Sequence, residues 1–256
     1  MSLQLPYCGS PPVPGELLSR FNLDPILIFA LLTLAVLHLA RLRGATGKAR
    51  LTASVGWTFA AAALISPLCA LSVSLFAARV GQHMILVLVA APLIACAWPR
   101  SHQALTLPRG RAWPLVTLAL AFFLALWFWH MPDPYDATFR STFVYWSMHV
   151  TLFGTALLLW RALLHHRPEQ TPEVIAIGAL TALQMSLLGA VLTFAGRPLF
   201  TWHILAMTSR WGLTPLQDQH LGGVFMWVPG MLLFAWFAVR TLGRLWNALE
   251  EGVKTA

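Results

Sequence analysis

The chain has 256 residues, of which 58% are hydrophobic and only 10% are charged. A water-soluble domain of this length needs more charge on its surface, so the composition excludes that class and predicts a protein dissolved in the lipid bilayer. The formal net charge of +8 would suit a nucleic-acid-binding protein, and the distribution of the charges, described below, excludes that class too.

Seven apolar stretches, spans 1 to 7, are each long enough to cross a bilayer as a helix. They lie at residues 23–41, 52–76, 80–98, 113–131, 142–164, 174–195 and 221–243. We therefore predict an all-α fold, a polytopic membrane protein built as a seven-transmembrane-helix bundle. The predicted parts are an extracytoplasmic N-terminal arm (1–22), a membrane domain (23–245) and a cytoplasmic tail (246–256). We expect no cleaved signal peptide, because the arm lacks a charged start and a small-residue cleavage site.

The basic residues lie mostly on one side of the predicted bundle, after spans 1, 3 and 5 and in the tail. Twelve of the 17 Lys and Arg residues belong to this group: Arg41, Arg43, Lys48, Arg50, Arg100, Arg109, Arg111, Arg161, Arg167, Arg240, Arg244 and Lys254. Loops rich in Lys and Arg stay in the cytoplasm. The bias therefore predicts an outside N-terminus and a cytoplasmic C-terminus, and no nucleic-acid partner.

Three cysteines are too few for a disulfide framework. Cys8 and Cys69 both fall toward the outer side, which allows a bridge between them. The favoured alternative is that Cys69 and Cys96 are buried packing residues, because free cysteine behaves as a small hydrophobe.

Five of the nine histidines map to the outer side of the predicted bundle: His83, His130, His149, His203 and His220. Four of them stand near the ends of four different spans, at a similar depth. One such histidine is usually an interfacial hydrogen-bonding group. Four at one level predict a metal site, because imidazole is the commonest metal-binding side chain and the mouth of a bundle brings such residues together.

Methionine accompanies these histidines. It neighbours or shares a helix face with four of them, in the pairs His83-Met84, His130-Met131, Met148-His149 and His203-Met207. Thioether sulfur with imidazole nitrogen suits Cu(I), whereas carboxylate-rich sites suit harder ions. We therefore predict a copper site, with core packing as the alternative role of each methionine.

Acidic residues follow span 4, where Asp133 and Asp136 stand in WHMPDPYDATF. Capping of the next helix is one role for both. The other is to orient His130 through a hydrogen bond or to neutralise a bound cation.

A second polar group stands where span 7 begins. Asp218 and Gln219 precede His220 there, and Gly222 and Gly223 follow. His220 is a candidate metal ligand, and Asp218 is its predicted charge partner. Gln219 either belongs to this polar site or has a purely interfacial role, and the two alternatives are equal. The two glycines allow close approach of a neighbouring helix.

Three motifs occur in the order GQHMILVLVAAPL, WHMPDPYDA and PLQDQHLGGVFMWVPG. Together they resemble the multi-span CtaG family of cytochrome c oxidase assembly factors, over most of the chain. The resemblance implies a non-enzymatic assembly factor in the bacterial inner (plasma) membrane that aids copper delivery to a haem–copper oxidase from a site on the outer face. The implied partners are an oxidase subunit, membrane lipid and a soluble copper carrier. The family motifs point to His83, His130, Asp136, His149, Asp218, Gln219 and Met226.

The chain departs from the family pattern at several places. Arg79 stands where the family often has a histidine, and residues 145–149 lack the usual His-x-x-Glu-His run. Two other functions remain open. A copper or small-solute permease needs polar groups through the membrane depth, where Gln184 is the main one. A haem- or quinone-linked membrane protein would use two facing imidazoles.

Overall fold

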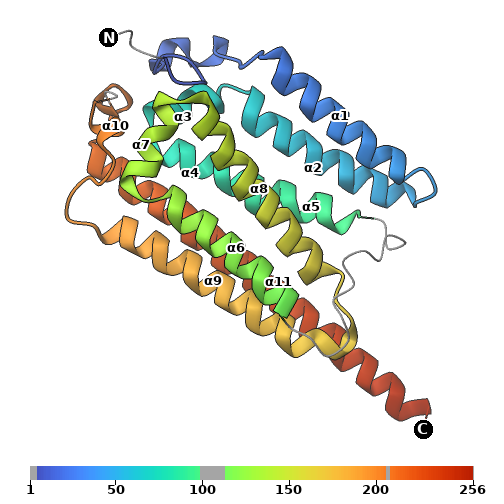
Figure 1. Ribbon diagram of the computed structural model, residues 1–256. Helices are drawn as coiled ribbons and strands as arrows, with labels where there is room; N and C mark the ends of the chain where they lie inside the picture. Colours follow the sequence, from blue (N-terminus) through green and yellow to red (C-terminus); the bar gives the residue numbers. More distant parts are fainter. Residues whose placement is uncertain (1–4, 99–112, 206–207, 256) are drawn as a thin grey trace.

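The computed structural model describes residues 5–98, 113–205 and 208–255, and all regular elements of these ranges are helices. Figure 1 shows an elongated bundle whose long helices run side by side. The N-terminal arm and three short helices gather at one end, and the chain's C-terminus lies at the other. The three short helices are α3 (Leu68–Ser74), α7 (Pro132–Arg140) and α10 (Thr201–Leu205). We call this the α7/α10 end.

Four helices of the described ranges are long and apolar enough to cross a membrane, and the number rises to six if each of two bent helix pairs is one span. The four are Phe76–Cys96, Thr142–Leu164 (α8), Pro168–Phe194 (η4, Pro168–Gln170, and α9, Thr171–Phe194) and Pro215–Asn247 (the larger part of α11, Pro215–Thr255). The bent pairs are α2 (Gly47–Ile65) with α3 and α6 (Trp113–Trp129) with α7. A further apolar helix, α1 (Pro25–Arg41), has 17 residues. The prediction of an all-α membrane protein is confirmed.

Proline sets both bends. The axes turn by 46° between α2 and α3, at Pro67, and by 73° between α6 and α7, at Pro132. Proline has no N–H to donate and clashes with the preceding turn, so it ends a helix and starts the next one in a new direction. Both bends place short helices across the α7/α10 end (Figure 1).

The most enclosed span is formed by α4 (Phe76–Met84), the π-helix η2 (Ile85–Ala90) and α5 (Ala91–Cys96). In its apolar window, 67% of the residues are buried, against 33–39% in the other three. The π-helical turn leaves the Val87 carbonyl free to accept a 2.9 Å hydrogen bond from Trp160 Nε1 of α8. Single π turns are frequent at functional sites, and this one directly follows His83 and Met84.

Close packing of α11 depends on glycine, as predicted. A Cβ on Gly222 would stand 2.5 Å from the Phe76 ring, and a Cβ on Gly223 would stand 2.7 Å from the Gly189 carbonyl oxygen of α9. Real side-chain contacts are longer than this. The glycines therefore let the backbone of α11 approach α4 and α9.

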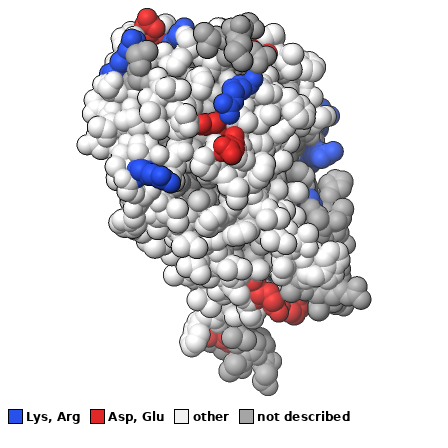
Figure 2. Space-filling view, turned by 60° about the vertical axis from the view of Figure 1, so that its left-hand side comes forward, with Lys and Arg blue, Asp and Glu red and all other residues white. Residues whose placement is uncertain are grey.

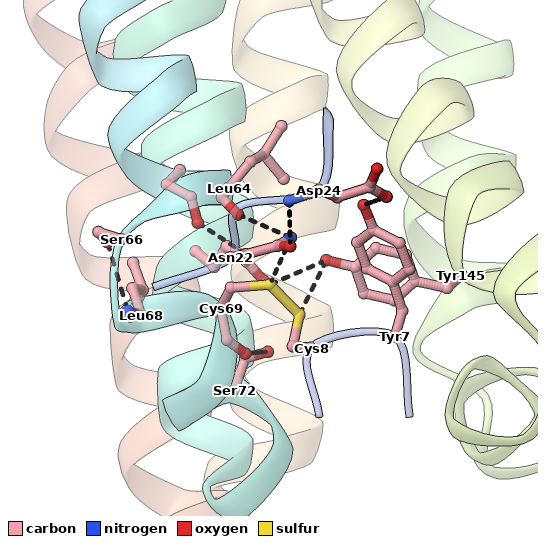
Figure 3. The surroundings of a disulfide bond; sticks show 12 residues. Tyr7, Cys8, Asn22, Asp24, Leu64, Ser66, Leu68, Cys69, Ser72 and Tyr145 are labelled. Atoms are coloured by element: carbon pink, nitrogen blue, oxygen red, sulfur yellow. Dashed lines mark hydrogen bonds between the residues drawn. A yellow bond between two sulfur atoms is a disulfide. The ribbon is translucent and has the colours of Figure 1, made fainter. Parts of the chain in front are cut away.

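The N-terminal arm is fastened to α3 by a disulfide between Cys8 and Cys69, whose Cα atoms lie 5.5 Å apart. Figure 3 shows its surroundings, in which the Tyr145 hydroxyl lies 3.4 Å from Cys8 Sγ and 3.7 Å from Cys69 Sγ. The favoured packing role was wrong on two counts: Cys69 is bridged, and Cys96 is free and exposed. A bridge joins residues distant in sequence, and their meeting depends on how the arm folds back.

The last helix is longer than the predicted span 7. It begins at Pro215, so the polar group Asp218–His220 lies in its first turns, and it continues as a helix through the predicted tail to Thr255. In Figure 2, charged side chains are spread over the upper half of the surface and an acidic group lies near its lower end, with a band without charged side chains between them. Such a band suits contact with lipid.

Candidate metal centre

Three of the predicted histidines meet inside the bundle near the α7/α10 end. His83 comes from α4, His149 from α8, and His130 directly follows α6. The His83 ring centroid lies 5.9 Å from that of His130 and 5.3 Å from that of His149. All three side chains are buried, with 1%, 4% and 3% of their surface exposed for His83, His130 and His149. We call these three residues the histidine cluster.

Two of the rings are oriented by the helices that carry them. His130 Nδ1 lies 2.7 Å from the Leu126 carbonyl oxygen, and His149 Nδ1 lies 3.0 Å from the Tyr145 carbonyl oxygen. Because a carbonyl only accepts, each Nδ1 carries the proton and each Nε2 carries a lone pair. This arrangement is the usual one for a metal-binding histidine, whose second nitrogen donates to a backbone carbonyl.

The remaining nitrogens of the histidine cluster have no hydrogen-bond partner. Nε2 of His130, Nε2 of His149 and both ring nitrogens of His83 are buried and unpartnered. A buried polar atom without a partner costs about 1–3 kcal/mol. Each neutral ring has one nitrogen lone pair, so the histidine cluster offers three lone pairs without a partner. They fit a ligand that accepts nitrogen lone pairs, and a soft or borderline metal ion is such a ligand.

The present side-chain positions do not form a finished metal site. No group of three or more His, Cys, Asp or Glu side chains in the described part of the chain is arranged to hold a metal ion. Backbone hydrogen bonds fix two of the rings, whereas His83 has none. His83 is therefore the one ring of the histidine cluster that no hydrogen bond holds in its present orientation.

A buried arginine borders the histidine cluster. Arg79 precedes His83 by one helical turn and is 1% exposed. Its guanidinium carbon lies 4.4 Å from the Phe139 ring centroid and 5.4 Å from that of Tyr145, and Nη1 donates to Thr138 Oγ1 at 3.3 Å. No ion pair with a carboxylate is formed by Arg79 within the described residues. Sequence reasoning noticed Arg79 only as a departure from a family pattern.

Asp218 performs a different task from the one predicted. Its carboxylate accepts hydrogen bonds from the backbone N–H groups of Phe76, at 2.6 Å, and Ala77, at 3.0 Å. These are the first residues of α4, whose own N-cap residue, Leu75, has no side-chain cap. Asp218 therefore caps the helix that carries His83.

Gln219 and His220 fasten the segment between α9 and α10. Gln219 Oε1 accepts a 2.7 Å hydrogen bond from the Leu199 N–H, and His220 Nε2 lies 3.0 Å from the Ala195 carbonyl oxygen. Gln219 is buried and His220 is half-buried. We see no ring contact between His220 and the histidine cluster, and we leave it out of the proposed ligands.

His203 of α10 has both ring nitrogens engaged. Its Nε2 accepts from the Tyr135 hydroxyl at 2.7 Å, and its Nδ1 faces the Ser74 carbonyl oxygen at 3.3 Å. Burial, reinforced by the Arg79 charge, lowers the pKa of His203 to about 3. The ring is thus a neutral structural link between α7, α3 and α10, without a free lone pair for a metal.

The two acidic residues that follow α6, Asp133 and Asp136, lie apart from the histidine cluster in their hydrogen bonding. Asp136 is buried, and its Oδ1 accepts a 3.3 Å hydrogen bond from the Trp202 N–H at the start of α10. Asp133 is exposed in the first turn of α7, where an acid favours the helix terminus. Neither is hydrogen-bonded to His130 in the structure.

The predicted methionines differ in their surroundings. Met148 and Met226 are fully buried in the main hydrophobic core, and Met131, beside His130, is 50% exposed. Met207 lies outside the described residues. Gln184 Oε1, at mid-bundle, accepts a 2.9 Å hydrogen bond from Trp127 Nε1, whereas its Nε2 is buried without a hydrogen-bond partner.

These features define a polytopic α-helical membrane protein with a buried cluster of three histidines near one end. The chain matches the profile of the family described as cytochrome c oxidase caa3 assembly factor (Caa3_CtaG) over residues 30–248, and it belongs to that family. No curated protein and no solved structure matches it. The resemblance carried by the three motifs is therefore confirmed.

Proposed function

We propose that this protein assists the assembly of a caa3-type cytochrome c oxidase by holding copper, as Cu(I), at the histidine cluster and passing it to an oxidase subunit. The observation that carries the proposal is the set of unpartnered, buried imidazole nitrogens contributed by α4, by α8 and by the residue directly after α6. The role is that of a chaperone and includes no catalysed reaction. A soluble copper carrier is the proposed donor, and lipid surrounds the bundle.

The proposed topology has seven spans, an outside N-terminus and a cytoplasmic C-terminus in a bacterial inner membrane. α1 and the two bent helix pairs complete the seven. The bias of Lys and Arg supports this orientation. The Cys8–Cys69 disulfide supports it independently, because disulfides persist in oxidising compartments outside the cytoplasm. The histidine cluster would then face the periplasmic or extracellular side.

The arrangement of the rings supports delivery rather than permanent storage. Two rings are fixed by their own helices, and the third, His83, has no hydrogen bond that must break before it turns. A site completed by a ligand that no hydrogen bond holds can gain or lose that ligand without breaking a bond to the rest of the bundle. This property suits an ion that has to be handed on.

The test is Cu(I) binding by the detergent-purified protein under reducing conditions, against a competing chelator. We expect one bound copper in the wild type and at least tenfold weaker binding in each of His83→Ala, His130→Ala and His149→Ala. His220→Ala is the matched control, because it removes an imidazole of the same end that is bonded to the Ala195 carbonyl. Its affinity should equal that of the wild type.

Two results would contradict the proposal. Wild-type protein without copper would leave only a role in holding the oxidase client. Copper that survives all three cluster variants would place the site elsewhere. An absorption spectrum of the same preparation tests the haem alternative, since two histidines that ligate a haem give a visible band.

A further inference from the structure

We propose that Arg79 makes the histidine cluster select a monovalent over a divalent metal ion, so that Cu(I) is favoured over Cu(II) by charge as well as by ligand softness. This inference rests on the proposed copper-binding function. It assigns a role to Arg79, which departs from the family pattern and is not itself a copper ligand.

The first step is that Arg79 is a cation without an anion. Its side chain is 1% exposed, and its neighbours are neutral: the Thr138 hydroxyl, the Ser72 carbonyl and three aromatic rings. An arginine keeps its charge in proteins even when it is buried. No carboxylate of the described residues is paired with it: Asp218 bonds to the first N–H groups of α4, and Asp136 bonds to the Trp202 N–H.

The Arg79 guanidinium lies close to the histidine cluster. Arg79 and His83 lie four residues apart on α4, and residues at this spacing share a helix face. The guanidinium carbon is 5.4 Å from the Tyr145 ring centroid, which is 4.3 Å from the His149 ring centroid. The positive charge is therefore within about 10 Å of the cluster, in a buried region where charges are weakly screened.

The Arg79 charge acts on a bound metal ion with a definite sign and size. A fixed positive charge opposes every bound cation, and it opposes a divalent ion twice as strongly as a monovalent one. Between Cu(II) and Cu(I) the difference is one unit charge, which at about 10 Å and an effective dielectric constant of about 20 corresponds to roughly tenfold in relative affinity. The cation–π contacts with Phe139 and Tyr145 hold the guanidinium in place.

The experiment compares Cu(I) and Cu(II) dissociation constants, or the midpoint potential of the bound ion, for wild type, Arg79→Gln and Arg79→Lys. Arg79→Gln should lower the preference for Cu(I) about tenfold, equivalent to a potential about 59 mV lower for this one-electron couple. Arg79→Lys keeps the charge and should retain the preference. Arg140→Gln, which removes an exposed arginine of the same end, is the control and should change nothing.

A folded Arg79→Gln protein with an unchanged preference would overturn the inference while leaving the copper function intact. Absence of copper from the wild type would remove both, so the two failures are distinguishable. If Arg79→Gln does not fold, Arg79→Met, which keeps the length of the side chain without its charge, takes its place in the same comparison. A folded Arg79→Met protein should show the same tenfold loss of preference for Cu(I), and an unchanged preference would overturn the inference.

Discussion

The carboxylate of Asp218 accepts a 2.6 Å hydrogen bond from the backbone N–H of Phe76, across 142 positions of sequence. The first N–H groups of a helix have no partner inside the helix, and an anion there also interacts favourably with the helix dipole. Asp218 thus joins the start of α11 to the start of α4 and sets the position of His83, seven residues further on.

The first prediction follows from this cap. Asp218→Ala should lower the free energy of unfolding by about 2 kcal/mol, because two buried N–H groups lose a charged acceptor. Thermal unfolding in detergent measures the change. Asp133→Ala, at an exposed acid, is the control and should stay close to wild type. Equal stability of the two variants would show that the cap contributes little.

The second prediction concerns the close approach of α11 and α9. In Gly223→Ala the new methyl group would stand 2.7 Å from the Gly189 carbonyl oxygen, so the two helices must separate and the unfolding temperature should fall by several degrees. Gly243→Ala, in the same helix, meets nothing within 4 Å. It should be neutral or stabilising, because alanine favours helices over glycine. A neutral Gly223→Ala would argue against the packing described.

The third prediction concerns the disulfide. Cys8 and Cys69 are 61 residues apart, and closing a loop of this length stabilises a protein by about 4 kcal/mol in the chain-entropy model. Cys8→Ser should therefore lower the unfolding temperature substantially, and a reductant should lower that of the wild type alone. Cys96→Ser serves as the control, since this cysteine is free. Insensitivity of the wild type to an effective reductant would be the contrary result.

The fourth prediction is a pH dependence due to His203. Its pKa is about 3 in the folded protein and about 6.5 when unfolded, so between these values the unfolded chain binds one more proton. This contribution is complete above pH 6.5 and is lost as the pH falls, by about 2 kcal/mol at pH 5. His203→Gln should unfold with a weaker dependence on pH between 7.5 and 5. Parallel curves for the two proteins would exclude this role.

The sequence was sufficient for the all-α membrane class, because long apolar stretches in a chain with 10% charge have few alternatives to membrane helices. It did not show the two bent helix pairs or the helical continuation of the last span to Thr255. It also identified the three clustered histidines, since their depth follows from their places in the spans. It could not separate them from His203 and His220. A histidine at the same depth can face any direction, and only the packed structure shows which ring nitrogens already have partners.

The acids and the cysteines show a second limit. Asp136 and Asp218 stand next to candidate ligands in sequence, yet each caps a helix from a distant part of the chain. Likewise, the Cys8–Cys69 pairing depends on the arm folding back onto α3. Such long-range partners leave no local pattern of spacing. Arg79 was visible as an unusual residue, but its lack of an anion becomes meaningful only when its neighbours are known.

The π-helical turn at Ile85–Ala90 has a consequence for how this span tolerates insertions and deletions. A π turn holds one residue more than an α turn, and each helical residue rotates the chain by about 100°. Removing a single residue here would convert the π turn into an α turn, so His83 and the α5 half of the span would keep nearly the same angular phase. Removing a residue from the α-helical part between His83 and α5 would instead rotate one half against the other by about 100° and leave the span just as apolar. Two chains with indistinguishable hydropathy could therefore differ in whether this histidine faces the other two.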